Sequence, residues 1–162
     1  MSLLEINCVS LEIHGEPILK NVSMQVERGR VLGVIGESGS GKSMTAFSVL
    51  QLLPNGSKCR GRISLAGQDI LTAGEKDLCS MRGREVGMVF QEPMTALNPL
   101  QTIGAQVAET ILVHERVPKA EALARAADAL RRAELPPDRF PLTRYPHELS
   151  GGQRQRVVIA MA

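Results

Sequence analysis

The sequence has few of the side chains that proteins use to bind nucleic acid. Its 162 residues include no tryptophan, one tyrosine and three phenylalanines, and the formal net charge at pH 7 is +2. Proteins that bind single strands stack the bases on aromatic rings, and proteins that coat nucleic acid neutralise many phosphates with lysine and arginine. The composition therefore argues against both functions, and we expect no nucleic-acid partner.

Cysteine is also scarce, and hydrophobic runs are short. Cys8, Cys59 and Cys79 are odd in number, widely spaced and without a CxxC pair, which favours reduced thiols over a disulfide framework. No apolar run approaches the ~20 residues that a membrane-spanning helix needs. The amino-terminal stretch carries Glu5 and Glu12 among its apolar residues and has no basic region, so we expect neither a signal peptide nor a transmembrane segment.

The residues that are present indicate one globular α/β domain. Hydrophobic residues make up 43% of the chain and charged residues 22%, which is typical of a protein with a packed core. Short, almost wholly apolar runs at Val31–Ile35 and Val86–Phe90 are typical of strands buried on both faces. The other expected strands are Leu3–Ile13, Val22–Val26 and Gly61–Gly67.

Helical patterns occur between these strands and dominate after Pro99. We expect Leu123, Ala127 and Leu130 to line one face of the middle helix, and Ser150 to cap the last one. The expected helices are Lys42–Leu53, Lys119–Glu134 and Gly152–Ala162.

A glycine-rich segment between an expected strand and an expected helix fits the pattern G-x-x-x-x-G-K-[ST]. Small residues let the backbone wrap a polyphosphate with its N–H groups directed inward, and the helix N-terminus adds a partial positive charge. In this interpretation Lys42 reaches the β- and γ-phosphates and the Ser43 hydroxyl ligates Mg²⁺. Met44 stands where a dinucleotide fingerprint has its third glycine, which excludes that alternative. The pattern predicts a nucleotide triphosphate site formed by Gly36, Glu37, Ser38, Gly39, Ser40, Gly41, Lys42 and Ser43.

A second glycine-containing helix start follows at Leu149-Ser150-Gly151-Gly152-Gln153. The Ser150 hydroxyl and the N–H groups of the two glycines form another anion-binding end. One nucleotide does not need two such ends from one chain, which suggests that this end serves a nucleotide held by another copy. A capped helix with a flexible lead-in is the alternative interpretation.

Three stretches together resemble the ATP-binding subunits of ABC transporters. They are GESGSGKS at 36–43, VFQEPMTALNPL at 89–100 and YPHELSGGQRQRVVIAMA at 145–162. Within that family they are most similar to the dipeptide, oligopeptide and nickel importer branch. The resemblance extends over essentially the whole chain, and LSGGQ is among the most specific motifs that an ATPase carries.

The resemblance implies an α/β fold of the P-loop NTPase class and of ABC type. A strand-rich subdomain and the P-loop core would span residues 1–100, a helical subdomain 101–150 and a signature helix 151–162. Two such domains would sandwich two ATP molecules head to tail. Each ATP would lie on the Lys42 loop of one copy and be capped by Ser150, Gly151, Gly152 and Gln153 of the other.

The resemblance also implies roles for Gln91 and His14. Gln91 matches the Q-loop glutamine, which in the family contacts Mg²⁺ and the attacking water, so Gln91 would serve catalysis and, with Ser43, metal binding. Residues 92–99 would form an exposed apolar patch against a cytoplasmic loop of a transmembrane partner. The family stacks adenine on an aromatic side chain where this sequence has His14, which is a candidate for that contact or a turn histidine without a ligand.

ATP and Mg²⁺ are the implied cofactors, and ATP hydrolysis would power import of peptides, nickel or glutathione. The implied partners are a second ATP-binding subunit, identical or different, and transmembrane permease subunits. A periplasmic or extracellular substrate-binding protein would act indirectly. A subunit of this kind would lie at the cytoplasmic face of the cell membrane as a peripheral protein.

The end of the sequence departs from the family pattern. There the family continues into a buried strand with the Walker B aspartate and a glutamate that activates water, and a switch histidine follows. This sequence stops at Ala162, so we expect the C-terminal part of the core to be missing. We then expect weak nucleotide binding without hydrolysis by these residues alone, in an amino-terminal piece of a longer reading frame.

Two alternatives to an importer subunit stay open. One is an ABC ATPase without a transport role, and the other is a non-catalytic, truncated P-loop module that pairs with a full-length partner. A P-loop kinase or GTPase is disfavoured by the LSGGQ motif.

Overall fold

The computed structural model describes residues 2–162, which divide into two compact units at residues 79 and 80. The first unit contains all the strands and one complete helix, and the second is helical. The subdivision at residues 100 and 150 that the family resemblance implies stays a prediction.

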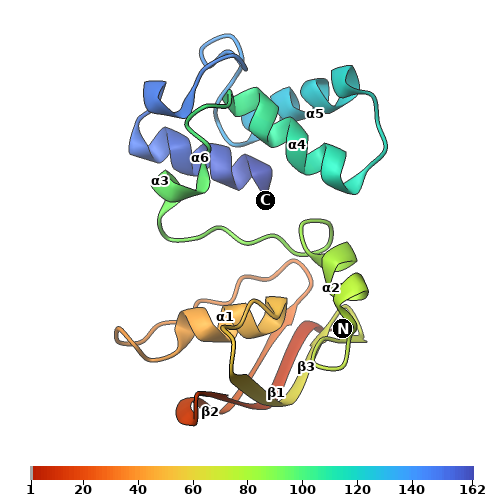
Figure 1. The fold of residues 1–162 in the computed structure, drawn as a ribbon, viewed down its shortest axis with the longest axis vertical. Coiled ribbons are helices and arrows are strands. Elements are labelled where there is room, and N and C mark those ends of the chain that lie inside the picture. Colours follow the sequence, from red (N-terminus) through yellow and green to blue (C-terminus); the bar gives the residue numbers. More distant parts are fainter. Residues whose placement is uncertain (1) are drawn as a thin grey trace. The chain divides into compact units, whose positions relative to one another are not determined.

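The first unit is built on a four-stranded antiparallel sheet in the order β2-β1-β3-β4 (Figure 1). The first two strands are joined by the tight turn at His14-Gly15, where both residues have positive φ (52° and 88°). The three expected strands at 3–13, 22–26 and 61–67 are therefore present, with different bounds. The strands are β1 (Ser2–Ile13), β2 (Glu16–Glu27), β3 (Ser57–Leu65) and β4 (Gln68–Asp69).

Between Ile6 and Ser10, β1 contains one more residue than the stretches of β2 and β3 that pair with it. Its pairing with β2 shifts between Ile6 and Val9, and its pairing with β3 shifts over the same stretch. Cys8 lies in this bulge with φ 51°, and a Cβ on Gly61 of β3 would lie 2.6 Å from the Cys8 carbonyl oxygen. Because alternate side chains of a strand point to opposite faces, the extra residue resets the alternation. As a result Ile6, Val9 and Leu11 are all buried.

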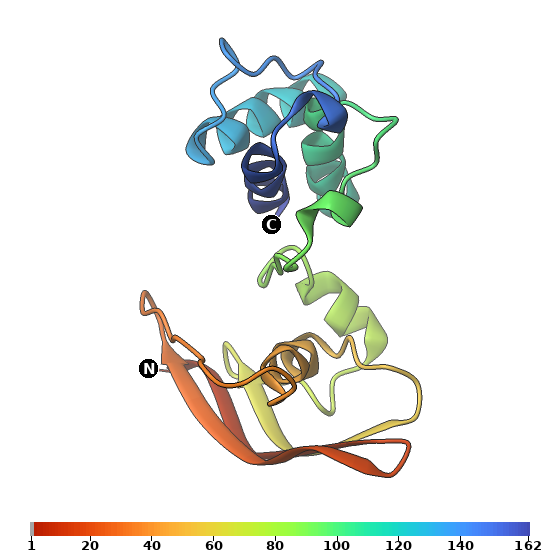
Figure 2. The same ribbon diagram turned by 90° about the vertical axis from the view of Figure 1, so that its left-hand side faces the viewer.

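Helix α1 (Lys42–Leu50) lies against one face of this sheet (Figures 1 and 2). It ends at Leu50, earlier than the predicted Leu53, because Gln51 adopts a left-handed conformation (φ 51°) and its N–H bonds back to the Phe47 and Ser48 carbonyls. The helix contributes four buried side chains, those of Thr45, Ser48, Val49 and Leu50.

Two predicted buried strands are absent. Val31–Ile35 lies outside any strand, and Val31 and Ile35 are 98% and 96% exposed. Val86–Phe90 also forms no strand, although an isolated bridge joins Val86 to Arg82. Both predictions are wrong for this structure, because apolar residues form a strand only where another strand supplies hydrogen-bond partners. No strand among residues 2–162 pairs with either segment.

The second unit consists of helices around one apolar core, with α4, α5 and α6 packed together (Figure 2). The division between the units falls within the short helix α2 (Glu75–Met81). Within residues 2–162, no helix has the length and apolar character to cross a bilayer. The remaining elements are α3 (Pro93–Ala96), α4 (Ile103–His114), α5 (Lys119–Arg132), the 3₁₀ turn η1 (Pro146–Glu148) and α6 (Gly151–Met161).

The buried face of α5 is rotated from the predicted one. Ala122, Ala126 and Leu130 are fully buried, whereas Leu123 is only partly buried against the core. These three residues recur every four positions and so lie on one helix face. The prediction favoured Leu123 and Ala127 with Leu130, and the structure instead turns the two alanines inward.

Candidate nucleotide site

The phosphate-loop motif closes around its own lysine. Lys42 is the first residue of α1, and its Nζ donates to the carbonyl oxygens of Gly36 (2.8 Å) and Glu37 (2.6 Å) and to Ser40 Oγ (3.3 Å). The motif residues that sequence analysis proposed, 36–43, are thus brought together as one loop. These three loop oxygens surround the Lys42 ammonium group. In a nucleotide complex, phosphate oxygens could occupy the same positions around it.

The glycines of this loop are required by its shape. Gly39 and Gly41 have φ of 81° and 87°, and Gly41 is the N-cap of α1. A Cβ on Gly41 would lie 2.5 Å from Leu19 Cδ2 of β2, and one on Gly36 would lie 2.9 Å from Ser40 Oγ. A larger residue at either position would therefore require the Leu19 or the Ser40 side chain to move. A small-residue turn leading into a helix N-terminus fits a polyphosphate, which needs close approach of backbone N–H groups.

The second glycine-containing start is built differently. Ser150 caps α6, as predicted: its Oγ accepts from the Gln153 N–H (3.4 Å), and its N–H donates to Gln153 Oε1 (2.9 Å). A Cβ on Gly151 or Gly152 would meet no atom within 4 Å. The first N–H groups of a helix have no partner within it, so this exposed end can accept an anion.

Gln91 and Ser43, the two predicted Mg²⁺ ligands, belong to different compact units. Ser43 is exposed in the first turn of α1, and Gln91 is exposed shortly before α3. Hydroxyl and amide oxygens are ligands of the kind that Mg²⁺ takes, so the donor set fits that ion. The segment after Gln91 is not uniformly exposed as predicted: Leu97 is buried in the core of the second unit. Among the residues of segment 92–99 whose side chains the structure describes, the exposed ones are Glu92, Thr95, Ala96, Asn98 and Pro99.

His14 occupies the turn between β1 and β2. Its N–H donates to the Gly56 carbonyl (3.3 Å), and a Cβ on Gly56 would lie 2.6 Å from the imidazole Cε1. The ring therefore lies beside the Gly56 backbone, and the residue is exposed. The adenine contact suggested for His14 stays a prediction.

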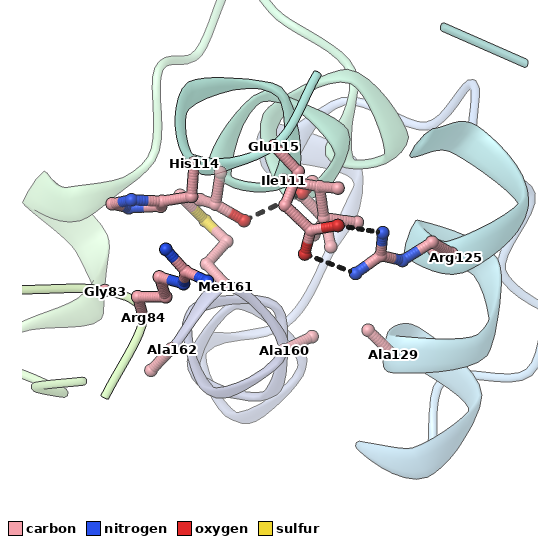
Figure 3. A pocket seen from close by; sticks show the side chains of 12 residues that line it. Gly83, Arg84, Ile111, His114, Glu115, Arg125, Ala129, Ala160, Met161 and Ala162 are labelled. Carbon is pink, nitrogen blue, oxygen red and sulfur yellow. Dashed lines mark hydrogen bonds and ion pairs between the residues drawn. The ribbon is translucent and has the colours of Figure 1, made fainter. Parts of the chain in front are cut away.

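A cavity of about 220 Å³ lies among α4, α5 and α6 (Figure 3). Arg125 and Glu115 both line it, and each Nη of Arg125 donates to one carboxylate oxygen of Glu115 at 2.7 Å. This paired hydrogen bond lowers the pKa of Glu115. None of the residues predicted to bind nucleotide lines the cavity, so it is separate from the candidate site.

Sequence reasoning missed two polar side chains that hold these segments. Gln106 is buried on α4, where its amide accepts from the Asn98 N–H (2.8 Å) and donates to the Asn98 and Gln101 carbonyls (both 3.0 Å). Arg154 follows the signature, and its Nε donates to the Pro146 carbonyl (2.7 Å). An arginine directly after LSGGQ was a visible signal, whereas a lone glutamine in an apolar helix was not.

The fold and the two glycine-rich helix starts define an ATP-binding cassette of the P-loop class. The chain belongs to the ABC transporter family, which matches residues 19–162. Among solved structures it is similar to a dimeric ATP-binding cassette in a post-hydrolysis state bound to ADP and Pi. That similarity has 30% identity and a TM-score of 0.81, and it covers 98% of this chain and 68% of the other. The predicted α/β fold of ABC type is thereby confirmed.

Curated relatives carry peptide-transport names. The chain is 53% identical over 146 residues to the probable D,D-dipeptide transport ATP-binding protein DdpD of Escherichia coli (strain K12), covering 89% of this chain and 44% of that protein. It is 40% identical over 166 residues to the oligopeptide transport ATP-binding protein OppD of Bacillus subtilis (strain 168), covering 99% and 46%. The chain thus spans about half the length of the curated relatives it matches.

Proposed function

We propose that this chain binds ATP with Mg²⁺ on the loop 36–43. Lys42 would exchange its loop carbonyl partners for the β- and γ-phosphates, and the backbone N–H groups before α1 would donate to the same phosphates. Ser43 and Gln91 would supply oxygen ligands to Mg²⁺. ATP supplies the phosphoryl group whose transfer to water releases free energy. The observation that supports this site is the lysine ammonium held by three loop oxygens.

We further propose that the start of α6 caps an ATP molecule held by a second ATP-binding subunit. Its two glycines are exposed and are not required by packing within the chain, because a Cβ on either would meet nothing within 4 Å. Alanine would be the more stable choice in a helix, so openness toward a ligand explains glycine better than folding does. Ser150 and Gln153 would complete the cap beside Gly151 and Gly152.

In a protein that continues to the length of these relatives, the ATP site would drive import of peptides. The support is the similarity to peptide-transport ATP-binding proteins, together with the importer-like segment 89–100. The permease subunits would contact the exposed residues around Gln91, at the cytoplasmic face of the membrane. A substrate-binding protein outside the membrane would choose the peptide. Co-purification of the longer protein with its permease subunits tests this assignment, and a longer protein that hydrolyses ATP without binding any permease would contradict it.

Nucleotide binding by the chain tests the loop assignment directly. Charge-assisted hydrogen bonds contribute about 1.5–3 kcal/mol, so Lys42→Ala should weaken binding of a fluorescent ATP analogue by about tenfold or more. Lys76→Ala is the matched control, because this exposed lysine of α2 lies outside the loop. Equal affinities of the two variants would contradict the assignment.

Association of two copies tests the cap. Ser150→Arg places a bulky side chain where the partner's γ-phosphate would lie, so ATP-driven pairing should be lost while analogue binding by the loop persists. Sedimentation velocity with and without ATP measures the pairing. A variant that pairs as well as the parent chain would contradict the proposed cap.

A further inference from the structure

The first turn of α6 has an unusual need for support from outside the helix. Its first two residues, Gly151 and Gly152, lose more backbone freedom on becoming helical than any other residue type would. Neither carries a side chain that could pack against the core. The capping box of Ser150 and Gln153 is local and exposed. A contact with a fixed neighbouring element is therefore needed to define the direction of this end.

Arg154 supplies such a contact. Its backbone N–H makes the first bond of the helix, to the Ser150 carbonyl (2.9 Å), and its side chain turns back toward the helix start. There Nε donates to the carbonyl oxygen of Pro146 at 2.7 Å. Together with the backbone from Pro146 to Arg154, this hydrogen bond closes a loop that contains every residue of the cap, from Ser150 to Gln153.

The partner of Arg154 is a well-fixed turn. Pro146 is buried, and its carbonyl also accepts the Leu149 N–H at 3.1 Å. Within the same turn, the Tyr145 N–H donates to Glu148 Oε2 (2.7 Å). Leu149 is buried in the core of the second unit. Arg154 therefore ties the exposed helix start to an element that is itself held by the core.

Arg156 offers a natural contrast on the same helix. Its Nη1 lies 2.7 Å from Glu134 Oε2, just after the end of α5, and it makes no bond to η1. Both arginines thus join α6 to a neighbouring segment, but only the bond of Arg154 reaches the turn that precedes the cap.

We propose that Arg154 is a positioning residue that sets the direction of the nucleotide cap through its Nε bond to the Pro146 carbonyl. This inference rests on the proposed function of the α6 start. Arg154 acts through backbone position, and the group that makes this bond is the donor at Nε.

Three substitutions of Arg154 distinguish the contribution of the Nε donor from that of the positive charge. Arg154→Gln keeps an N–H donor the same number of bonds from the backbone as Nε and removes the charge. Arg154→Lys keeps the charge and places its donor one bond further out, and Arg154→Met removes both. Arg156→Met is the matched control for loss of an arginine from α6.

Two measurements on the full chain test the proposal. ATP-driven pairing, measured by sedimentation velocity, should weaken by about tenfold or more in Arg154→Met, weaken less in Arg154→Gln, and stay within about twofold of the parent in Arg156→Met. Amide hydrogen exchange, measured without nucleotide at residues 153 and 154, should quicken by about fivefold in Arg154→Met alone. Fluorescent ATP analogue binding by the Lys42 loop should be unchanged in all variants.

The outcomes separate this inference from the function on which it rests. Exchange in Arg154→Met that matches the parent would overturn the positioning role, whether or not the chains pair. Pairing retained by Arg154→Lys but lost by Arg154→Gln would also overturn it, since charge would then be the required property. A parent chain that binds the analogue but never pairs with ATP would overturn the proposed cap, and the exchange measurement would still decide the role of Arg154.

Discussion

The two helices that begin beside glycine, α1 and α6, use that residue for different reasons. At α1, Gly41 has φ 87° and a Cβ there would collide with Leu19. At α6, Gly151 and Gly152 are helical, and the space beside each Cα is open. The first glycine is required by the fold, and the other two are only permitted by it.

The difference teaches how to recognise a glycine that serves a ligand. Both starts look alike in the sequence, since each combines serine, glycine and the beginning of a helix. The surrounding atoms separate them, because only at α1 do neighbouring atoms leave no room for a Cβ. A glycine that folding does not need, at a helix start that alanine would stabilise, points to something outside the chain.

Replacing Gly41 should give the largest effect. Gly41→Ala forces a left-handed backbone on alanine and a collision with Leu19, which together should cost about 2–4 kcal/mol of unfolding free energy. Urea unfolding followed by circular dichroism measures the loss. Gly67→Ala is the control, because Gly67 has the same φ of 87° and nothing within 4 Å. Equal losses in the two variants would show that the Leu19 contact contributes nothing.

Removing the cap of α6 should give the next largest effect. Ser150→Ala leaves the Gln153 N–H without its acceptor, and loss of such a cap costs about 1 kcal/mol. Ser38→Ala, in the loop before α1, is the matched change, because α1 has no side-chain cap to lose. Unfolding in urea should distinguish the two, and a Ser38 variant as unstable as the Ser150 variant would contradict the contrast.

A glycine-to-alanine substitution at the start of α6 should raise the unfolding free energy, whereas the same substitution at the start of α1 should lower it. Gly152→Ala should raise the unfolding free energy by up to about 1 kcal/mol, since alanine is the better helix former and the site has room. The same variant should pair less readily with ATP, because a methyl group then occupies the open end. Thermal unfolding and sedimentation velocity measure the two effects. A destabilised variant would show that Gly152 is required by folding after all.

Lowering the pH should give the smallest change in stability, through an ion pair in the second unit. Hydrogen bonds from Arg125 lower the pKa of Glu115, so the pair stabilises the folded state above the unfolded pKa of about 4.3. That contribution is lost as the pH falls through the lower, folded pKa. Unfolding midpoints between pH 7 and the acid range should therefore fall less in Glu115→Gln than in the parent. Identical pH profiles would contradict a contribution from this pair.

Local signals sufficed for the motifs, whereas strands that need distant partners could not be predicted in the same way. The starts of α1 and α6 follow from Lys42 and Ser150, since capping and glycine preferences act within a few residues. Val31–Ile35 has the composition of a buried strand and forms none, because a strand depends on a neighbour that no local pattern can supply.

The candidate site shows the same division between local and distant information. The loop around Lys42 could be predicted from its spacing, because one short segment contains every part of it. The bond from Arg154 to Pro146 joins residues eight apart across a turn and an exposed cap, and the arginine after LSGGQ does not by itself reveal its partner. The inward rotation of Ala122 and Ala126 likewise depends on the helices packed against α5.

The bulge at Cys8 lets β1 hold an extra residue without moving its buried side chains to the other face. Deleting one residue there would restore simple alternation and leave Ile6, Val9 and Leu11 on the same face. Where the extra residue is kept, the φ of 51° favours asparagine or glycine at this position. Natural variants of this strand should therefore differ at position 8 by a gap as well as by substitution.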